Sequence, residues 1–184
     1  HMTQLTDAEI TQAAEHKISV AHCPESNLKL ASGFCPIGKL MAAGVNVAIG
    51  TDGAASNNDL DMLGEMRTAA LLAKAVAADA MAMSATEALH AATLGGARAL
   101  GVHREIGSLV PGKRADFIAI NLNDVSTQPL YNVISQVVYA ASREQVTHSY
   151  VAGQALMRNR VLTTLDEDAI VARAAEWRQR VRPG

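Results

Sequence analysis

Residues 45–58, VNVAIGTDGAASNN, decide the fold that this sequence predicts. The apolar run at 45–49 is short and bounded by turn residues, which is typical of a buried strand. Gly50 and Gly53 stand on either side of Asp52 and end the strand in a turn. The Asp52 carboxylate is therefore expected to project from the C-terminal edge of this strand.

The same arrangement occurs once more upstream, so the pattern indicates an α/β fold. An apolar run at 18–21 precedes His22 and predicts a second strand. Helices are predicted at 6–15, 36–43, 60–77 and 84–94, with a loop at 24–33, a helix break at Gly95-Gly96 and a short turn at 97–100. Two strands, each followed by a helix, suit either a doubly wound sheet or a (β/α)8 barrel. Spacing alone does not choose between them.

After Gly101 the pattern changes to short apolar runs separated by turns. Strands are predicted at 116–120, 137–140 and 146–151, with Gly153 at a hairpin turn, and a final helix is predicted at 167–180. These residues therefore predict a small β region followed by a helix.

Composition narrows the class of partner. Apolar residues make up 49% of the chain, and the net charge is -2 without a basic run, which disfavours nucleic acid and favours a small-molecule site. No stretch approaches the roughly 20 apolar residues of a membrane span, and residues 1–20 lack a signal-peptide pattern, so we expect no membrane association and a cytoplasmic location. Cys23 and Cys35 are too few for a four-cysteine zinc site.

Three residues are candidates for a functional site. A carboxylate at a strand's C-terminal edge, such as Asp52, can bind a metal and accept a proton from water, although Asp-Gly is also a common turn pair. His22 ends the other predicted strand, where it could hydrogen-bond a substrate or serve as a structural histidine. Ser56 lies in the loop after Asp52, where a serine can equally stabilise the turn. The other histidines show no metal-ligand spacing.

Four ordered motifs carry a resemblance to a known family. They are 22–30 (HCPESNLKL), 50–58 (GTDGAASNN), 92–101 (ATLGGARALG) and 107–116 (GSLVPGKRAD). Together they resemble the amidohydrolase superfamily over essentially the whole chain. Within it, the pattern is most similar to the 5-methylthioadenosine/S-adenosylhomocysteine deaminases, and guanine deaminases and triazine hydrolases share much of it.

The resemblance implies a fold in three segments. Residues 1–105 would form the C-terminal part of a (β/α)8 metallo-dependent hydrolase barrel, whose last two strands are 18–21 and 45–49. Residues 106–163 would form the C-terminal share of a small β-sandwich, and residues 164–184 a C-terminal helix.

The resemblance also implies zinc-dependent deamination of a purine nucleoside by a longer, homo-oligomeric protein. Such enzymes bind one Zn²⁺ through a His-x-His pair, a further histidine and the last-strand aspartate, here Asp52, which would also take the proton of the attacking water. The sequence contains no His-x-His pair, so the other ligands are expected outside it and the fragment alone is expected to be inactive. His1-Met2 is either a cloning remnant or a family feature, and His1 is not predicted as a ligand. Alternatives are a guanine deaminase or triazine-type hydrolase, and a truncated, non-catalytic module.

Overall fold

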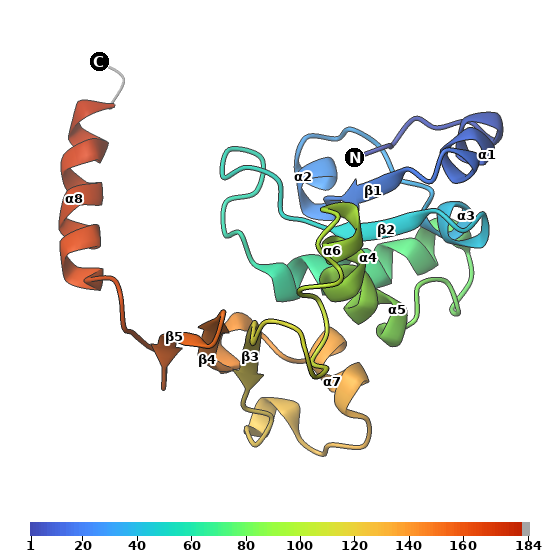
Figure 1. Ribbon diagram of the computed structural model, residues 1–184. Helices are drawn as coiled ribbons and strands as arrows, with labels where there is room; N and C mark the ends of the chain where they lie inside the picture. Colours follow the sequence, from blue (N-terminus) through green and yellow to red (C-terminus); the bar gives the residue numbers. More distant parts are fainter. Residues whose placement is uncertain (182–184) are drawn as a thin grey trace.

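The computed structural model describes residues 1–181, and its first part is built around two short strands (Figure 1). The elements of this part are α1 (Asp7–Glu15), β1 (Ser19–His22), α2 (Pro24–Lys29), α3 (Ile37–Ala42), β2 (Asn46–Ile49), α4 (Met62–Ala77), α5 (Ala85–His90), the π-helical segment η1 (Ala91–Gly95) and α6 (Gly96–Ala99).

The second part contains the remaining strands and the last helix. Its elements are β3 (Phe117–Ile120), the 3-10 segment η2 (Val125–Thr127), α7 (Val133–Tyr139), the 3-10 segment η3 (Arg143–Gln145), β4 (Val146–Val151), β5 (Gln154–Arg158), β6 (Val161–Leu162) and α8 (Glu167–Arg180).

Strands β1 and β2 pair in parallel, which confirms the predicted α/β arrangement. His22 at the end of β1 lies opposite Ile49 at the end of β2. The contact continues one residue further, because the Gly50 N–H donates to the His22 carbonyl at 3.0 Å. The two C-terminal strand ends, and the loops that follow them, are therefore held at the same edge.

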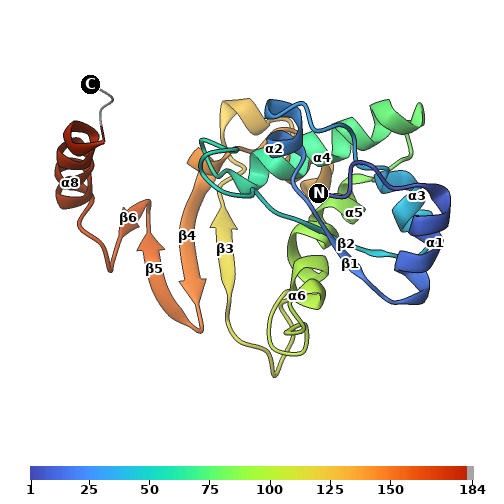
Figure 2. The same cartoon turned by 90° about the horizontal axis from the view of Figure 1, so that it is seen from above.

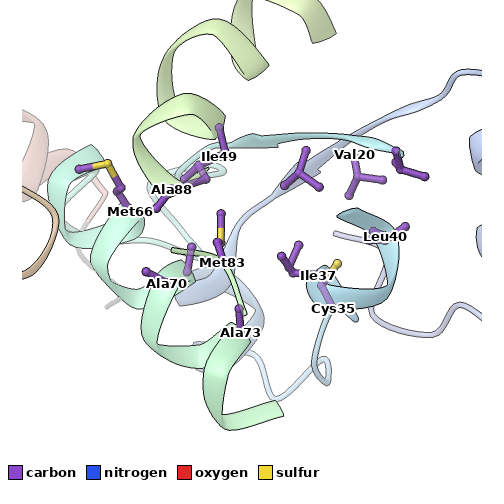
Figure 3. Close-up of a cluster of buried hydrophobic side chains, with 14 of the residues drawn as sticks. Val20, Cys35, Ile37, Leu40, Ile49, Met66, Ala70, Ala73, Met83 and Ala88 are labelled. Atoms are coloured by element: carbon purple, nitrogen blue, oxygen red, sulfur yellow. The ribbon is translucent and has the colours of Figure 1, made fainter. Parts of the chain in front are cut away.

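A hydrophobic core lies between the strand pair and the helices that cover one of its faces (Figure 3). Val20 of β1 and Ile49 of β2 contribute to it from the strands. Leu40 of α3 and Met66 of α4 approach from the helices, and both are almost completely buried. Because buried side chains of this size each stabilise a fold by about 1.5–3 kcal/mol, this packing fixes where the strands end relative to α4.

The predicted helix break at Gly95-Gly96 is wrong. α5, η1 and α6 follow one another without interruption, and both glycines have helical φ values, -60° and -61°. The glycine at 95 is required by packing instead, because a Cβ there would overlap the backbone carbonyl oxygen of Val47 in β2. The Asn46 side-chain amide also donates to the Gly95 carbonyl at 3.0 Å, which ties this helix to β2.

Two further expectations from the sequence are corrected. The predicted loop at 24–33 begins with the helix α2, which starts at Pro24, a residue well suited to the first helical turn. The predicted strand at 137–140 is instead the end of α7. Val138 is fully buried in this helix, and Arg67 of α4 donates to the Val138 and Ala141 carbonyls at 3.4 and 2.5 Å.

The remaining strands form an antiparallel sheet in the order β3-β4-β5-β6. The helix α8 follows this sheet, and Asp166 caps its first turn by accepting from the Ala169 N–H at 3.0 Å. None of its residues is buried, and both views show it standing apart from the other elements (Figures 1 and 2). Within residues 1–181, no helix is long and apolar enough to cross a bilayer.

Candidate functional site

Asp52 lies just beyond β2, with its backbone in the left-handed region at φ 63°. Aspartate tolerates this conformation better than most residues, but it remains uncommon outside glycine, and such residues cluster at functional sites. The Asp52 side chain keeps 36% of its surface exposed. The carboxylate is therefore presented to the space beyond the strand ends, as the sequence predicts.

Two serines from different segments of the chain donate to the same oxygen of Asp52. Ser26 Oγ in α2 and Ser56 Oγ in the loop after Asp52 each lie 2.8 Å from Asp52 Oδ2. These hydrogen bonds, from Ser26 first and Ser56 second, hold the pKa of the Asp52 carboxyl below its usual range, because they favour its ionised form. The site thus contains an oriented carboxylate that is ionised at neutral pH.

The loop that supplies Ser56 is a tight turn closed by its own backbone. The N–H groups of Ser56 and Asn57 both donate to the Gly53 carbonyl, at 3.1 and 2.9 Å. From outside the turn, Lys29 Nζ donates to the Ala55 carbonyl at 2.9 Å. The structure therefore brings Ser56 into contact with Asp52, and it adds Ser26 as a second donor to the same carboxylate.

His1 also reaches this carboxylate. Its Nε2 lies 3.4 Å from Asp52 Oδ2, and its Nδ1 lies 2.7 Å from Asn27 Oδ1 in α2. The backbone nitrogen of His1 donates to the Ala21 carbonyl at 3.0 Å, which fixes the residue beside β1. The geometry places an imidazole next to Asp52, although no spacing pattern singles out His1.

His22 occupies a different environment. It is 1% exposed, lies on the same face of β1 as Val20, and its Nδ1 has no hydrogen-bond partner among the described residues. Burial lowers the pKa of this imidazole to about 4, so it is neutral near pH 7. Within residues 1–181, no hydrogen bond connects the His22 side chain to Asp52, so its predicted role in substrate binding stays a prediction.

A buried carboxylate behind the site was not found from the sequence. Glu65 in α4 is completely buried, and it accepts from the Glu25 N–H at 3.3 Å and from the Asn57 side-chain amide. Burial raises the pKa of Glu65 to about 7, and the nearby Glu25 carboxylate adds to this rise, while the hydrogen bonds from the Glu25 N–H and Asn57 oppose it. The only signal in the sequence is an acid among the buried positions of a helix, and that signal is weak without the structure.

The metal-binding capacity of this edge is incomplete in the described part of the chain. No group of three or more His, Cys, Asp or Glu side chains in residues 1–181 could hold a metal ion. A catalytic zinc ion takes three protein ligands from nitrogen, sulfur or carboxylate donors. Asp52 fits one such ligand by its chemistry and its exposure.

Comparisons with known proteins agree with this geometry. The Amidohydrolase family matches residues 1–156. The chain is 51% identical over 181 residues to a 5-methylthioadenosine/S-adenosylhomocysteine deaminase of Teredinibacter turnerae, covering 98% of this chain and 41% of that protein.

Solved structures match as well. An adenosine deaminase from Xanthomonas campestris with bound zinc superposes with a TM-score of 0.98 at 59% identity, over 99% of this chain and 42% of that one. An atrazine chlorohydrolase from Arthrobacter aurescens complexed with zinc gives a TM-score of 0.89 at 29% identity, over 96% of this chain and 39% of that one. The chain spans about two fifths of the length of these relatives, and it belongs to the amidohydrolase family.

Proposed function

We propose that the chain is part of a zinc-dependent deaminase that converts the adenine amine of 5-methylthioadenosine or S-adenosylhomocysteine into an inosine-type product and ammonia. The observation that carries this proposal is the Asp52 carboxylate, presented at the strand edge and oriented through one of its two oxygens. The deaminase names of relatives with about half of their matched residues identical, and the zinc in the related structures, support it.

The chemistry follows from the residues at this edge. Zinc, when bound, would lower the pKa of water to about 7 and so make it a nucleophile at neutral pH. Asp52 supplies one ligand and accepts the proton of the attacking water. Ser26 and Ser56 hold the carboxylate in one orientation, and their hydrogen bonds keep it ionised, which both tasks require. The amine then leaves the purine carbon as ammonia.

Several further assignments belong to the same proposal. His22 and Ser56 contribute to binding the purine nucleoside together with Asp52, and one zinc ion serves each site. Residues 1–105 belong to the barrel and 106–163 to the small β-sandwich. Residues 164–184 form a C-terminal segment with the helix Glu167–Arg180, and its residues 182–184 lie outside the described residues. The protein is a homo-oligomer in the cytoplasm, which suits its two unpaired thiols, Cys23 and Cys35.

The test uses a full-length protein in which these residues follow an N-terminal segment of the kind that the relatives possess. We expect it to contain zinc and to release ammonia from methylthioadenosine, S-adenosylhomocysteine or adenosine. Asp52→Asn should lower kcat by about 10²–10⁴-fold, the range for loss of a group that transfers protons. Asp79→Asn is the matched control, since Asp79 lies in the loop after α4 and accepts from the Met81 N–H.

The outcomes separate the alternatives. Ammonia release from guanine only, or hydrolysis of a triazine only, would replace the proposed substrate with one of those classes. A full-length protein that binds no zinc and acts on none of these compounds would support a non-catalytic module. The isolated 184-residue chain is expected to be metal-free and inactive, and stoichiometric zinc in it would contradict that expectation.

A further inference from the structure

We propose that Glu65 is a positioning residue for Asp52: its carboxylate, on the core side of α4, fastens the start of α2 and the loop after Asp52, whose serines orient the Asp52 carboxylate. The inference rests on the proposed role of Asp52 as a metal ligand. Glu65 itself does not touch the site, so any effect it has on the reaction is transmitted through Ser26 and Ser56.

The two oxygens of Glu65 contact two different segments, the start of α2 and the loop after Asp52, each at a residue next to one of the serines. Oε2 accepts from the Glu25 N–H at 3.3 Å, and Glu25 directly precedes Ser26. Oε1 accepts from the side-chain amide of Asn57, which directly follows Ser56. The two serines converge on Asp52 Oδ2, each at 2.8 Å. One buried group thus links both donors of the carboxylate.

Asn57 is held in the loop after Asp52 by hydrogen bonds of both its side chain and its backbone. Asn57 Oδ1 accepts from the Leu60 N–H at 3.0 Å, so the amide is held at both of its ends. The backbone N–H of Asn57 donates to the Gly53 carbonyl at 2.9 Å, which closes the turn that contains Ser56. A displacement of Asn57 therefore moves Ser56 relative to Asp52.

A purely structural role for Glu65 explains its chemistry poorly. A fully buried glutamate is rare unless it is paired, and no lysine, arginine or histidine in residues 1–181 forms an ion pair with it. Its neighbours in the same helix, Leu63 and Met66, are apolar and buried, and an apolar residue at 65 would avoid the cost of desolvating an acid. A side chain with two acceptor oxygens receives both donors at once, one at each oxygen.

The experiment compares the full-length protein with its Glu65→Gln variant by two measurements. Glutamine keeps the shape but offers one acceptor oxygen, and its NH₂ group faces a donor. We expect faster hydrogen–deuterium exchange in peptides covering 23–29 and 53–58, a readout that needs no metal. We also expect zinc affinity, measured by chelator competition, to fall about 10-fold, the lower end of what loss of a group supporting a metal ligand costs.

A rescue variant separates positioning from a general loss of stability. Combining Glu65→Gln with Asn57→Asp reverses the direction of one hydrogen bond, because the glutamine NH₂ can donate to the new carboxylate. The glutamine oxygen remains free to accept from the Glu25 N–H. Loop exchange and zinc affinity are expected to return to within about 3-fold of the wild type.

Met66→Ala is the matched control, since Met66 is the next residue of α4 and packs in the hydrophobic core. It should lower global stability and leave the exchange of 53–58 and the zinc affinity close to wild type. If Glu65→Gln does not fold, Asn57→Ala breaks the same contact from the loop side, and the same changes are expected.

Unchanged loop exchange together with unchanged zinc affinity in Glu65→Gln overturns the inference. So does an equal loss of zinc affinity in Met66→Ala, because stability alone would then account for the effect. A wild-type protein that binds no zinc refutes the proposed function instead, and the exchange data still decide whether Glu65 holds the loops.

Discussion

Two adjacent glycines are expected to respond to the same substitution with opposite signs. Gly95 and Gly96 have nearly identical helical backbones, so an alanine improves the helix propensity by about 1 kcal/mol at either position. At Gly96 the added Cβ fits, because the nearest atom, the Ala91 carbonyl oxygen, is 3.9 Å away. Gly96→Ala should therefore raise the free energy of unfolding by about 1 kcal/mol.

At Gly95 the added Cβ meets backbone that cannot move away as a side chain could. It would overlap the Val47 carbonyl oxygen and lie 3.2 Å from the His90 carbonyl oxygen. Overpacking of this kind costs about 1–3 kcal/mol, and we expect the upper end because β2 itself is displaced. After the propensity gain, Gly95→Ala should lower the free energy of unfolding by about 2 kcal/mol.

The assay is urea denaturation of the two variants in parallel, followed by far-ultraviolet circular dichroism. The comparison is internally controlled, because both variants add the same methyl group to the same helix one residue apart. Their free energies of unfolding should differ by about 3 kcal/mol. A difference below about 1 kcal/mol, or a more stable Gly95→Ala variant, would refute the packing of this helix against β2.

Three further outcomes are expected. Ser26→Ala should raise the pKa of the Asp52 carboxyl, because it removes the largest of the hydrogen-bond contributions that favour its ionised form. A carbon-detected NMR titration would show no change if that bond were absent. The raised pKa of Glu65, about 7, contributes stability that is lost as pH rises from about 4.5 to 7, whereas the lowered pKa of His22, about 4, contributes stability that is lost as pH falls from about 6.5 to 4. When the pH is lowered from 7 to 5, the melting temperature should therefore rise in His22→Gln, which keeps only the Glu65 effect. It should fall in Glu65→Gln, which keeps only the His22 effect, and equal changes in the two variants would contradict the assignment. Arg67→Met should cost about 1–3 kcal/mol of stability in a denaturant titration by leaving two carbonyls of the α7 region without their donor, and a neutral variant would argue against that contact.

The parts of the fold that sequence predicts well are those in which a local pattern and the tertiary packing agree. The strand 45–49 was predicted because an apolar run between turn residues has few other uses, and Val47 and Ile49 are indeed core residues. The helix break at Gly95 was wrong because a glycine needed for close approach to a strand has the same local signature as one that ends a helix. The strand at 137–140 was wrong because a run of apolar residues is equally compatible with a helix that buries one side, as Val138 shows.

The residues of the candidate site also differ in whether a local sequence pattern reveals them. Asp52 and Ser56 are candidates from the sequence because polar residues in the turn after a strand are visible locally, and the structure places their side chains in contact. Glu65 is not visible from the sequence because its hydrogen-bond partners, Glu25 and Asn57, lie 40 and 8 residues away in the chain. The contact of His1 with the Asp52 carboxylate is not visible from the sequence either, because distant residues, Asn27 and Ala21 at the edge of β1, hold His1 in place.

The isolated position of α8 has a consequence for spectroscopy. Trp177 is the only tryptophan in the sequence, it lies in α8 with 51% of its surface exposed, and the Arg180 guanidinium stands 5.3 Å from its ring centre. Intrinsic fluorescence therefore does not report on the core between β1, β2 and α4. An emission maximum that shifts to shorter wavelength would instead record a second surface closing over this helix, so the chain carries a natural optical probe of assembly.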